Sequence, residues 1–449
     1  MTTTSETGTD AAGAVAGSAA SSTGSTAAGS PRVRTVATAF SSRANSIGFF
    51  RWLLAFSVIF SHAGPLAGFY GQEDLGTKGM ESSWWPTWLT SSEQSLGGVA
   101  VAGFFFFSGF LITRSRARTG MVRYFWRRVL RIMPAFWCAL LLTAFVLGPI
   151  AWVQEKGHLA GYFSASSDSP LTYVPQNMFL VLNQRNIAEM GQSLPFADIG
   201  GYDWNGSAWT LQYEFKAYIL VGVLGIVGYA ASRWLTTLAA LGIIAFNALV
   251  WSGHIALGDL GGPLAAPFGH PFLTDAFNPM LIAPFAFGML FAIWGRFIPV
   301  HWALALAGLA IAAYCYGHGG WNVGGQYGLL YFCMWGAISW SRLQHWEKYG
   351  DFSYGVYIFA WPLMQFVSYF GLEKAGMLAY FAVIVVGTHV LAFCSWHLIE
   401  KPAMSLKDWS PASLLARRRD ASAADRPDTP GSDSSDQKAP ALAGATTDA

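Results

Sequence analysis

Phe49 to Pro65 read FFRWLLAFSVIFSHAGP, an apolar run with one arginine near its start and one histidine near its end. On an α-helix, the eleven steps from Arg51 to His62 return the chain to within about 20° of the same face, about 16 Å further along the axis. Ionisable groups inside a membrane span are costly and usually face a bundle interior or a watery cavity. The stretch therefore predicts a transmembrane helix with a polar stripe that crosses most of the bilayer.

The composition indicates an all-α polytopic membrane protein. Hydrophobic residues make up 53% of the chain, charged residues only 12%, and the mean hydropathy is +0.36. A net charge of +2 gives no reason to expect nucleic acid as a partner. The four cysteines fall inside apolar runs without metal-ligand spacing, so we interpret them as small buried hydrophobic residues and predict no metal site.

The apolar stretches and the Lys/Arg distribution together predict the topology. Ten stretches approach the roughly 20 residues of a span; they lie near 47–66, 97–113, 133–153, 208–230, 235–252, 279–296, 299–317, 324–341, 352–370 and 376–398. With the N-terminus inside, the predicted outer segments hold few basic residues, namely Lys78, Lys156, Arg185 and Lys374. We therefore predict ten spans, with both termini cytoplasmic and the protein in the plasma membrane.

The chain ends differ in composition from the apolar part. Residues 1–45 and 406–449 are rich in small and polar residues, which predicts disordered cytoplasmic tails around a transmembrane domain over 46–405. Two long outer loops, 67–96 and 154–207, carry acidic and tryptophan residues. These loops suit a hydroxyl-rich acceptor such as a sugar, although tryptophans also serve as membrane-interface anchors.

His62 and Glu214 are the candidate proton-transfer groups. The ordinary pKa of histidine lies near neutrality, so His62 suits a base that takes a proton from a hydroxyl group. The simpler alternative is a histidine hydrogen-bonded between helices. Glu214, early in the fourth predicted span, is positioned to orient His62 or to stabilise its protonated form.

The arginines before the third predicted span are candidate donor contacts. Arg127, Arg128 and Arg131 lie at the expected inner mouth, and guanidinium groups bind phosphate in a bidentate manner. The alternative is that they only fix the topology, as the dense arginines before them do. In the second predicted span, residues 97–112 combine small side chains, which allow close helix packing, with aromatic ones that suit an acyl-chain tunnel.

These motifs together resemble the integral-membrane acyltransferase 3 family, whose members O-acylate sugars, polysaccharides, lipids and some macrolides. The resemblance covers about residues 45–405. It rests on Arg51 and His62, and on the segments Phe104–Ile112, Arg127–Pro134, Trp209–Glu214, Ser353–Tyr357 and His397–Pro402.

The resemblance implies an acyl-CoA donor bound from the cytoplasm and an acceptor acylated at the outer face. His62 corresponds to the essential histidine, Arg51 to its partner in the motif, and Glu214 to the glutamate of the Trp-Ser/Thr-Leu motif. The donor-side and substrate-binding candidates are Arg127, Arg128, Arg131, Ser108, Trp209, Tyr218 and Tyr357.

Two positions depart from the family pattern. Ala102 stands where many members carry aspartate, and Ala360 stands where many carry histidine before Trp-Pro. The missing carboxylate leaves Glu214 as the expected partner of His62.

The sequence therefore predicts a bacterial membrane-bound O-acyltransferase with no bound cofactor. Its co-substrate would be acyl-CoA, most simply acetyl-CoA, and its acceptor a carbohydrate, a glycolipid or a secondary metabolite. A transporter or flippase of a lipid-linked sugar is the alternative, because several spans with central polar residues also suit transport. The sequence identifies neither the acyl group nor the acceptor.

Overall fold

The structure is a computed structural model that describes residues 34–42, 44–69, 94–195, 197, 203–226, 229–257, 275 and 277–408. Within these ranges the chain is helical, and its β-type pairing is limited to an isolated antiparallel bridge between Thr35 and Pro299. The α-helices are α1 (Val36–Ala39), α2 (Ile47–Leu66), α3 (Leu96–Arg116), α4 (Met121–Leu142), α5 (Gly148–Lys156), α6 (Pro170–Asn177), α7 (Leu211–Leu224), α8 (Tyr229–Trp251), α9 (Phe277–Trp294), α10 (Trp302–His318), α11 (Gln326–Ser339), α12 (Ser353–Ser368), α13 (Met377–Ser395) and α14 (Lys401–Ser405).

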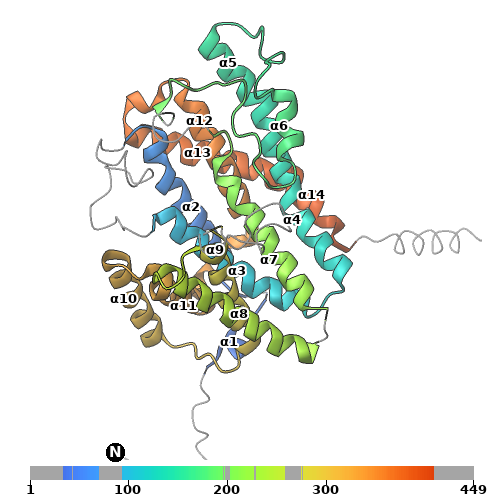
Figure 1. The fold of residues 1–449 in the computed structure, drawn as a ribbon, viewed down its shortest axis with the longest axis vertical. Coiled ribbons are helices and arrows are strands. Elements are labelled where there is room, and N and C mark those ends of the chain that lie inside the picture. Colours follow the sequence, from blue (N-terminus) through green and yellow to red (C-terminus); the bar gives the residue numbers. More distant parts are fainter. Residues whose placement is uncertain are drawn as a thin grey trace, which may run out of the picture.

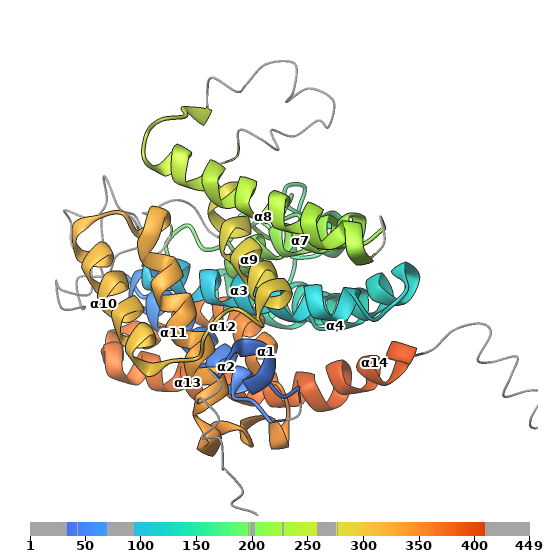
Figure 2. The ribbon, with the colours of Figure 1, turned by 90° about the horizontal axis from the view of Figure 1, so that it is seen from below.

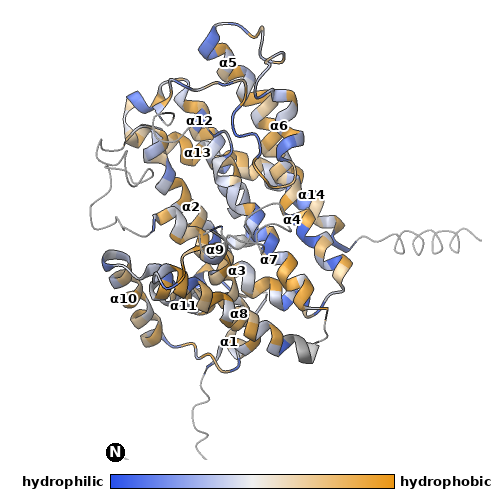
Figure 3. Cartoon of the chain, in the orientation of Figure 1, coloured by the Kyte–Doolittle hydropathy of each residue, from blue (hydrophilic) through white to orange (hydrophobic). Residues whose placement is uncertain are grey.

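Each of the ten predicted stretches overlaps a helix, and α2 has the predicted bounds. In the described part of the chain, five helical segments are long and apolar enough to cross a membrane: Ile47–Leu66, Leu96–Arg116, Met121–Lys156, Arg233–Trp251 and Met377–Asp408. Figure 3 shows hydrophobic residues along most of the helices. The protein is therefore an all-helical membrane protein. The number of spans and the location of its termini stay predictions.

Helix α2 lies inside the bundle and contacts α3, α12, α13 and α11 (Figures 1 and 2). One side of α2 places Phe50, Leu54 and Val58 in the larger hydrophobic core. Ala55 and Ile59 pack into a second, smaller core with residues of α12 and α13. Because apolar side chains are buried on two sides, α2 holds its polar side chains in fixed positions within the bundle.

Helices α3 and α9 approach each other at two glycines. A Cβ atom on Gly109 would lie 2.0 Å from the carbonyl oxygen of Phe285, and one on Gly288 would lie 2.1 Å from that of Phe106. Neither site has room for a side chain, so the small residues of α3 serve close helix packing. Phe106 is fully buried in the core, whereas Phe104 and Phe105 line a cavity described below. The close packing is therefore confirmed, whereas an acyl chain in the cavity beside Phe104 and Phe105 stays a prediction.

Residues on both sides of the predicted domain boundaries contact the helical bundle. Val36, within the predicted N-terminal tail, is buried, and its N–H donates to the carbonyl oxygen of Ile298 at 2.9 Å. At the other end, Trp126 Nε1 donates to the carbonyl oxygen of Leu406 at 2.9 Å. These contacts with distant segments satisfy backbone groups that would otherwise bind water. Residues 1–33, 43 and 409–449 of the predicted tails, and most of the predicted loop 67–96, lie outside the described residues.

Candidate active site

A central cavity of about 110 Å³ lies between α2, α3, α4, α7 and α12. Its wall combines aromatic and aliphatic side chains with a small set of polar ones, which is the usual character of a small-molecule site. Seven of the residues predicted from the sequence meet here: Arg51, Ser108, Arg128, Arg131, Glu214, Tyr218 and Tyr357. Residues from distant segments therefore form one site.

Glu214 is held in the cavity wall by two hydroxyl groups. It lies in the first turn of α7, and Tyr218 follows one turn later, so both side chains lie on one face of the helix. Ser108 Oγ donates to Glu214 Oε1 at 2.8 Å, and the Tyr218 hydroxyl donates to the same oxygen. These contacts join α7 to α3 and fix the position of the carboxylate.

Asp351, which the sequence did not single out, links two of the predicted arginines. Asp351 Oδ2 lies 2.6 Å from Arg51 Nη1 and 2.5 Å from Arg131 Nη2. Ser353 Oγ donates to Asp351 Oδ1 at 2.6 Å. Arg131 also reaches Glu400, whose Oε2 lies 3.3 Å from Nη1. The two arginines and two carboxylates balance in charge, as a buried ionic cluster requires.

Asp351 lies just before α12, and its electrostatic environment favours the ionised carboxylate. Burial alone would raise its pKa, but the positive charges of Arg131 and Arg51 and the hydrogen bond from Ser353 outweigh burial. The pKa of Asp351 therefore lies well below its ordinary value. The nearest sequence signals were indirect: Asp351 precedes the motif Ser353–Tyr357, and Glu400 lies within His397–Pro402.

Arg128 and Arg127 have different partners from Arg51 and Arg131, the two arginines that contact Asp351. The guanidinium carbon of Arg128 lies 6.0 Å and 5.9 Å from the ring centres of Tyr124 and Tyr218. In the described part of the chain, Arg128 has no ion pair, and its buried Nε has no hydrogen-bond partner. Arg127 lies outside the cavity wall and pairs with Asp408, its Nη2 2.6 Å from Oδ1. Of the two, Arg128 is the one placed to meet a ligand.

Tyr357 fixes the segment that leads into α7. Its hydroxyl donates to the carbonyl oxygen of Ser207 at 2.5 Å, so its contact of 2.6 Å with Thr210 makes the Thr210 hydroxyl the donor. Trp209 lies between these two residues but does not line the cavity, and its ring packs edge-on against Tyr213. The Trp-Thr-Leu segment thus positions Glu214 through its hydrogen bonds to α12.

His62 lies towards the opposite end of α2 from Arg51 and is not part of the cavity wall. Its ring centre is 4.9 Å from that of Trp361, edge-on. Trp361 Nε1 donates to the carbonyl oxygen of Asp203 at 2.7 Å, which joins this pair to the predicted outer loop. His62 Nδ1 is buried without a hydrogen-bond partner in the described structure. Among the described residues, the hydrogen bonds of Glu214 come from Ser108 and Tyr218 and not from His62, so the cooperation of His62 with Glu214 stays a prediction.

Comparison with known proteins identifies the chain. The sequence profile of the acyltransferase 3 family, an acyltransferase domain, matches residues 45–397. The chain belongs to the acyltransferase 3 family. This match covers the helices that form the central cavity and includes every predicted site residue.

Two relatives extend this finding. This acyltransferase is similar to an O-acetyl transferase of Shigella phage Sf6, with 26% identity over 322 residues, or 69% of this chain and 85% of the relative. It is also similar to nodulation protein 10 of Rhizobium leguminosarum bv. viciae, with 26% identity over 406 residues, or 83% and 96% of the two chains. No solved structure gives a significant match. The family and the phage relative indicate an O-acyltransferase.

Proposed function

We propose that this protein moves an acyl group, most simply acetyl, from cytoplasmic acyl-CoA to a hydroxyl group of a carbohydrate or glycolipid at the outer face of the plasma membrane. The observation that carries the proposal is the central cavity, where arginines suited to phosphate share one space with Glu214 and the Ser108 hydroxyl. The relative named an O-acetyl transferase supports acetyl as the group transferred.

Arg128 is the proposed contact for the diphosphate of the donor. Arg51 and Arg131 are already paired with Asp351, so a phosphate would have to displace a carboxylate to reach them. Arg128 keeps its donors for a ligand, and its guanidinium group lies over two tyrosine rings. A preorganised fork of this kind suits a bidentate contact with phosphate oxygens.

His62 is the proposed base. An imidazole nitrogen takes the proton of the acceptor hydroxyl as the hydroxyl oxygen attacks the carbonyl carbon of the thioester. The carbon–sulfur bond then breaks, and the departing thiolate recovers the proton from the imidazole. His62 suits this role because it lies on the stripe of α2 that begins at Arg51, towards the predicted outer end, where the acceptor would arrive.

The test is thioester cleavage by the purified protein in nanodiscs. Acetyl-CoA is supplied, and free CoA thiol is measured for the wild type, His62→Ala, Arg128→Gln and the control His318→Ala, which alters an exposed histidine at the end of α10. We expect His62→Ala to lower kcat at least 100-fold, the contribution of about 10² or more that a general base makes. We expect Arg128→Gln to raise KM for acetyl-CoA, and His318→Ala to match the wild type. Failure of the wild type to cleave or bind any acyl-CoA would overturn the proposal and favour a transporter.

A further inference from the structure

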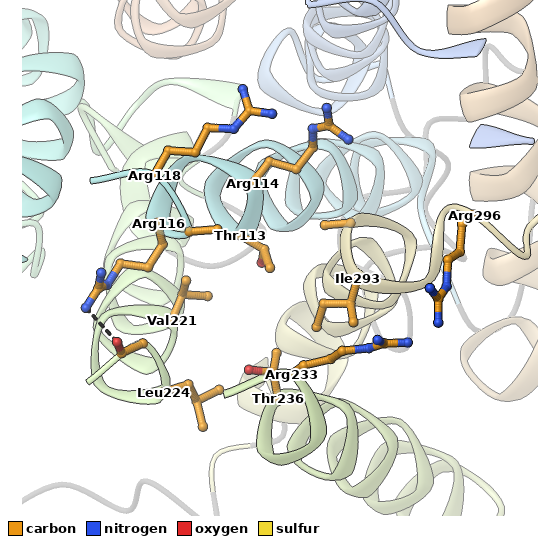
Figure 4. A pocket seen from close by; sticks show the side chains of 13 residues that line it. Thr113, Arg114, Arg116, Arg118, Val221, Leu224, Arg233, Thr236, Ile293 and Arg296 are labelled. Atoms are coloured by element: carbon orange, nitrogen blue, oxygen red, sulfur yellow. Dashed lines mark hydrogen bonds between the residues drawn. The ribbon is translucent and has the colours of Figure 1, made fainter. Parts of the chain in front are cut away.

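A second cavity, of about 410 Å³, lies where the C-terminal ends of α3, α7 and α9 meet the start of α8 (Figure 4). Five arginines line it: Arg114, Arg116, Arg118, Arg233 and Arg296. We call this cavity the arginine pocket. The arginines come from three separate parts of the chain, and Figure 4 shows Arg233 and Arg296 reaching towards the same space.

Among the residues that the structure describes, no negative side chain balances the arginine pocket. Among the described residues, no carboxylate lines the pocket, and none of its five arginines forms an ion pair. The ends of α3, α7 and α9 each supply a partial charge of about −0.5, which offsets less than half of the positive charge. The arginines of the central cavity, in contrast, include Arg51 and Arg131, which are balanced by Asp351 and Glu400.

Contacts beside the pocket fix the side chains of Arg116 and Arg233 without using all their donors. Arg116 donates to the carbonyl oxygens of Thr119 and Gly225, each at 2.9 Å. The guanidinium carbon of Arg233 lies 4.0 Å from the ring centre of Trp294. The buried Nε atoms of Arg116 and Arg233, and the hydroxyl oxygen of Thr113, have no hydrogen-bond partner in the described structure. Buried donors of this kind need acceptors, and phosphate oxygens supply several at once.

The arginine pocket lies next to the central cavity along two helices. Leu111 and Ile112 of α3 line the central cavity, and the next residue, Thr113, lines the arginine pocket. On α7, Glu214 and Val221 lie seven residues, or about 10 Å, apart on nearly the same face. The pocket lies on the side of the central cavity that the arginine distribution predicts to be cytoplasmic.

We propose that the arginine pocket binds the phosphorylated nucleoside end of the acyl donor, while the thioester end occupies the central cavity. The inference rests on the proposed function in taking acyl-CoA as the donor. If these arginines served only to set the orientation of the protein in the membrane, they would need only to lie in the inner loops. That role would not require arginines from α3, from α8 and from the chain beyond α9 to line one cavity.

The first test is binding of adenosine 3′,5′-bisphosphate, a phosphorylated nucleoside without a thioester, to the full-length protein in nanodiscs. We expect the double variant Arg233→Gln/Arg296→Gln to weaken binding at least tenfold, and the corresponding double lysine variant to restore part of the affinity. Arg123→Gln is the matched control, because Arg123 is exposed and lines neither cavity. Equal affinity in the wild type and the double variant overturns the inference.

The second test compares two donors, acetyl-CoA and S-acetylpantetheine, which lacks the phosphorylated nucleoside. We expect the ratio of kcat/KM for acetyl-CoA to that for S-acetylpantetheine to fall at least tenfold in Arg233→Gln/Arg296→Gln and to stay unchanged in Arg123→Gln. An unchanged ratio in the double variant overturns the inference while the proposed function stands. Turnover of S-acetylpantetheine shows that the variant is folded.

The outcomes separate this inference from the proposed function. Arginine-dependent binding of the bisphosphate without any thioester cleavage supports the pocket and contradicts the proposed reaction. Nanodiscs of phosphatidylglycerol and phosphatidylcholine distinguish a lipid phosphate from a nucleotide phosphate. If the double variant alters only retention of phosphatidylglycerol and not nucleotide affinity, the pocket is a lipid site and the inference is wrong.

Discussion

Asp351 is the residue that links the charged groups at the end of the site predicted to face the cytoplasm. Its Oδ2 atom accepts from Arg51 at 2.6 Å and from Arg131 at 2.5 Å, and Arg131 in turn reaches Glu400. The side chains of Arg51, Arg131 and Asp351 are 21%, 16% and 16% exposed, so solvent screens these charges only weakly. Arg51 therefore has a structural partner, Asp351, at one end of α2, in addition to any contact with the acyl donor.

Replacing Asp351 tests this cluster. Asp351→Asn leaves two buried guanidinium groups with Glu400 as their remaining carboxylate, and breaking a buried pair costs about 3–5 kcal/mol. We expect a clear fall in the thermal unfolding temperature of the detergent-solubilised protein. Asp408→Asn, which breaks the exposed pair with Arg127, is the control and should change the unfolding temperature little. Equal unfolding temperatures for the two variants would show that the Asp351 cluster contributes no stability.

The same cluster has a defined pH dependence. Because the pKa of Asp351 is lower in the folded than in the unfolded protein, its contribution is complete above the unfolded pKa of about 3.9 and is lost as the pH falls below that value. We expect the difference in unfolding temperature between wild type and Asp351→Asn to stay constant from pH 8 to about pH 5 and to shrink below about pH 4. A difference that shrinks between pH 8 and pH 6 would contradict this assignment.

At the level of helices, the packing of α3 against α9 holds both cavities in place. Helix α3 contributes residues to the central cavity and to the arginine pocket, and α9 covers it at Gly109 and Gly288. Small residues matter at such contacts because helices in lipid associate by close packing rather than by the hydrophobic effect.

Gly109→Ala tests this packing. The new methyl group would lie 2.0 Å from the carbonyl oxygen of Phe285, so α3 and α9 must separate, at an expected cost of about 1–3 kcal/mol. We expect a lower thermal unfolding temperature. Gly242→Ala in α8 is the matched control, since its added methyl group meets nothing within 4 Å and alanine favours a helix. An unchanged unfolding temperature in Gly109→Ala would show that the two helices are less tightly packed than the structure has them.

At the scale of the whole molecule, the positions of the two cavities and of His62 indicate from which side the donor and the acceptor would arrive. The arginine pocket and the Asp351 cluster lie towards the end predicted to face the cytoplasm, and His62 lies towards the end joined to Asp203 of the predicted outer loop. A donor from one side and an acceptor from the other would then meet inside the bundle.

Cysteine labelling in intact cells tests this orientation. In a variant with the four natural cysteines replaced, we expect His158→Cys to react with a membrane-impermeant maleimide added outside. We expect Arg342→Cys to react only after the cells are permeabilised. Both positions are exposed in the structure, so burial does not limit the reaction. The reverse pattern would invert the predicted topology and place the arginine pocket outside.

The sequence by itself determined the helical class, the bounds of α2, the family and most of the polar residues of the central cavity. These follow from local properties: apolar length, the spacing of Arg51 and His62 on one helix, and short motifs such as Trp209–Glu214. A span must satisfy its backbone hydrogen bonds within itself, so its presence can be recognised from a single segment.

Only the tertiary structure decided which charges meet. Asp351 lies 300 positions from Arg51 and 220 from Arg131 in the chain, and no local sequence pattern predicts that they pair. Likewise, Arg114, Arg233 and Arg296 lie in separate parts of the sequence, yet they line one pocket. The physical reason is that the packing of the helices decides which charged side chains lie beside one another. A charge inside a membrane protein is stabilised where an opposite charge lies beside it and is left unbalanced where none does.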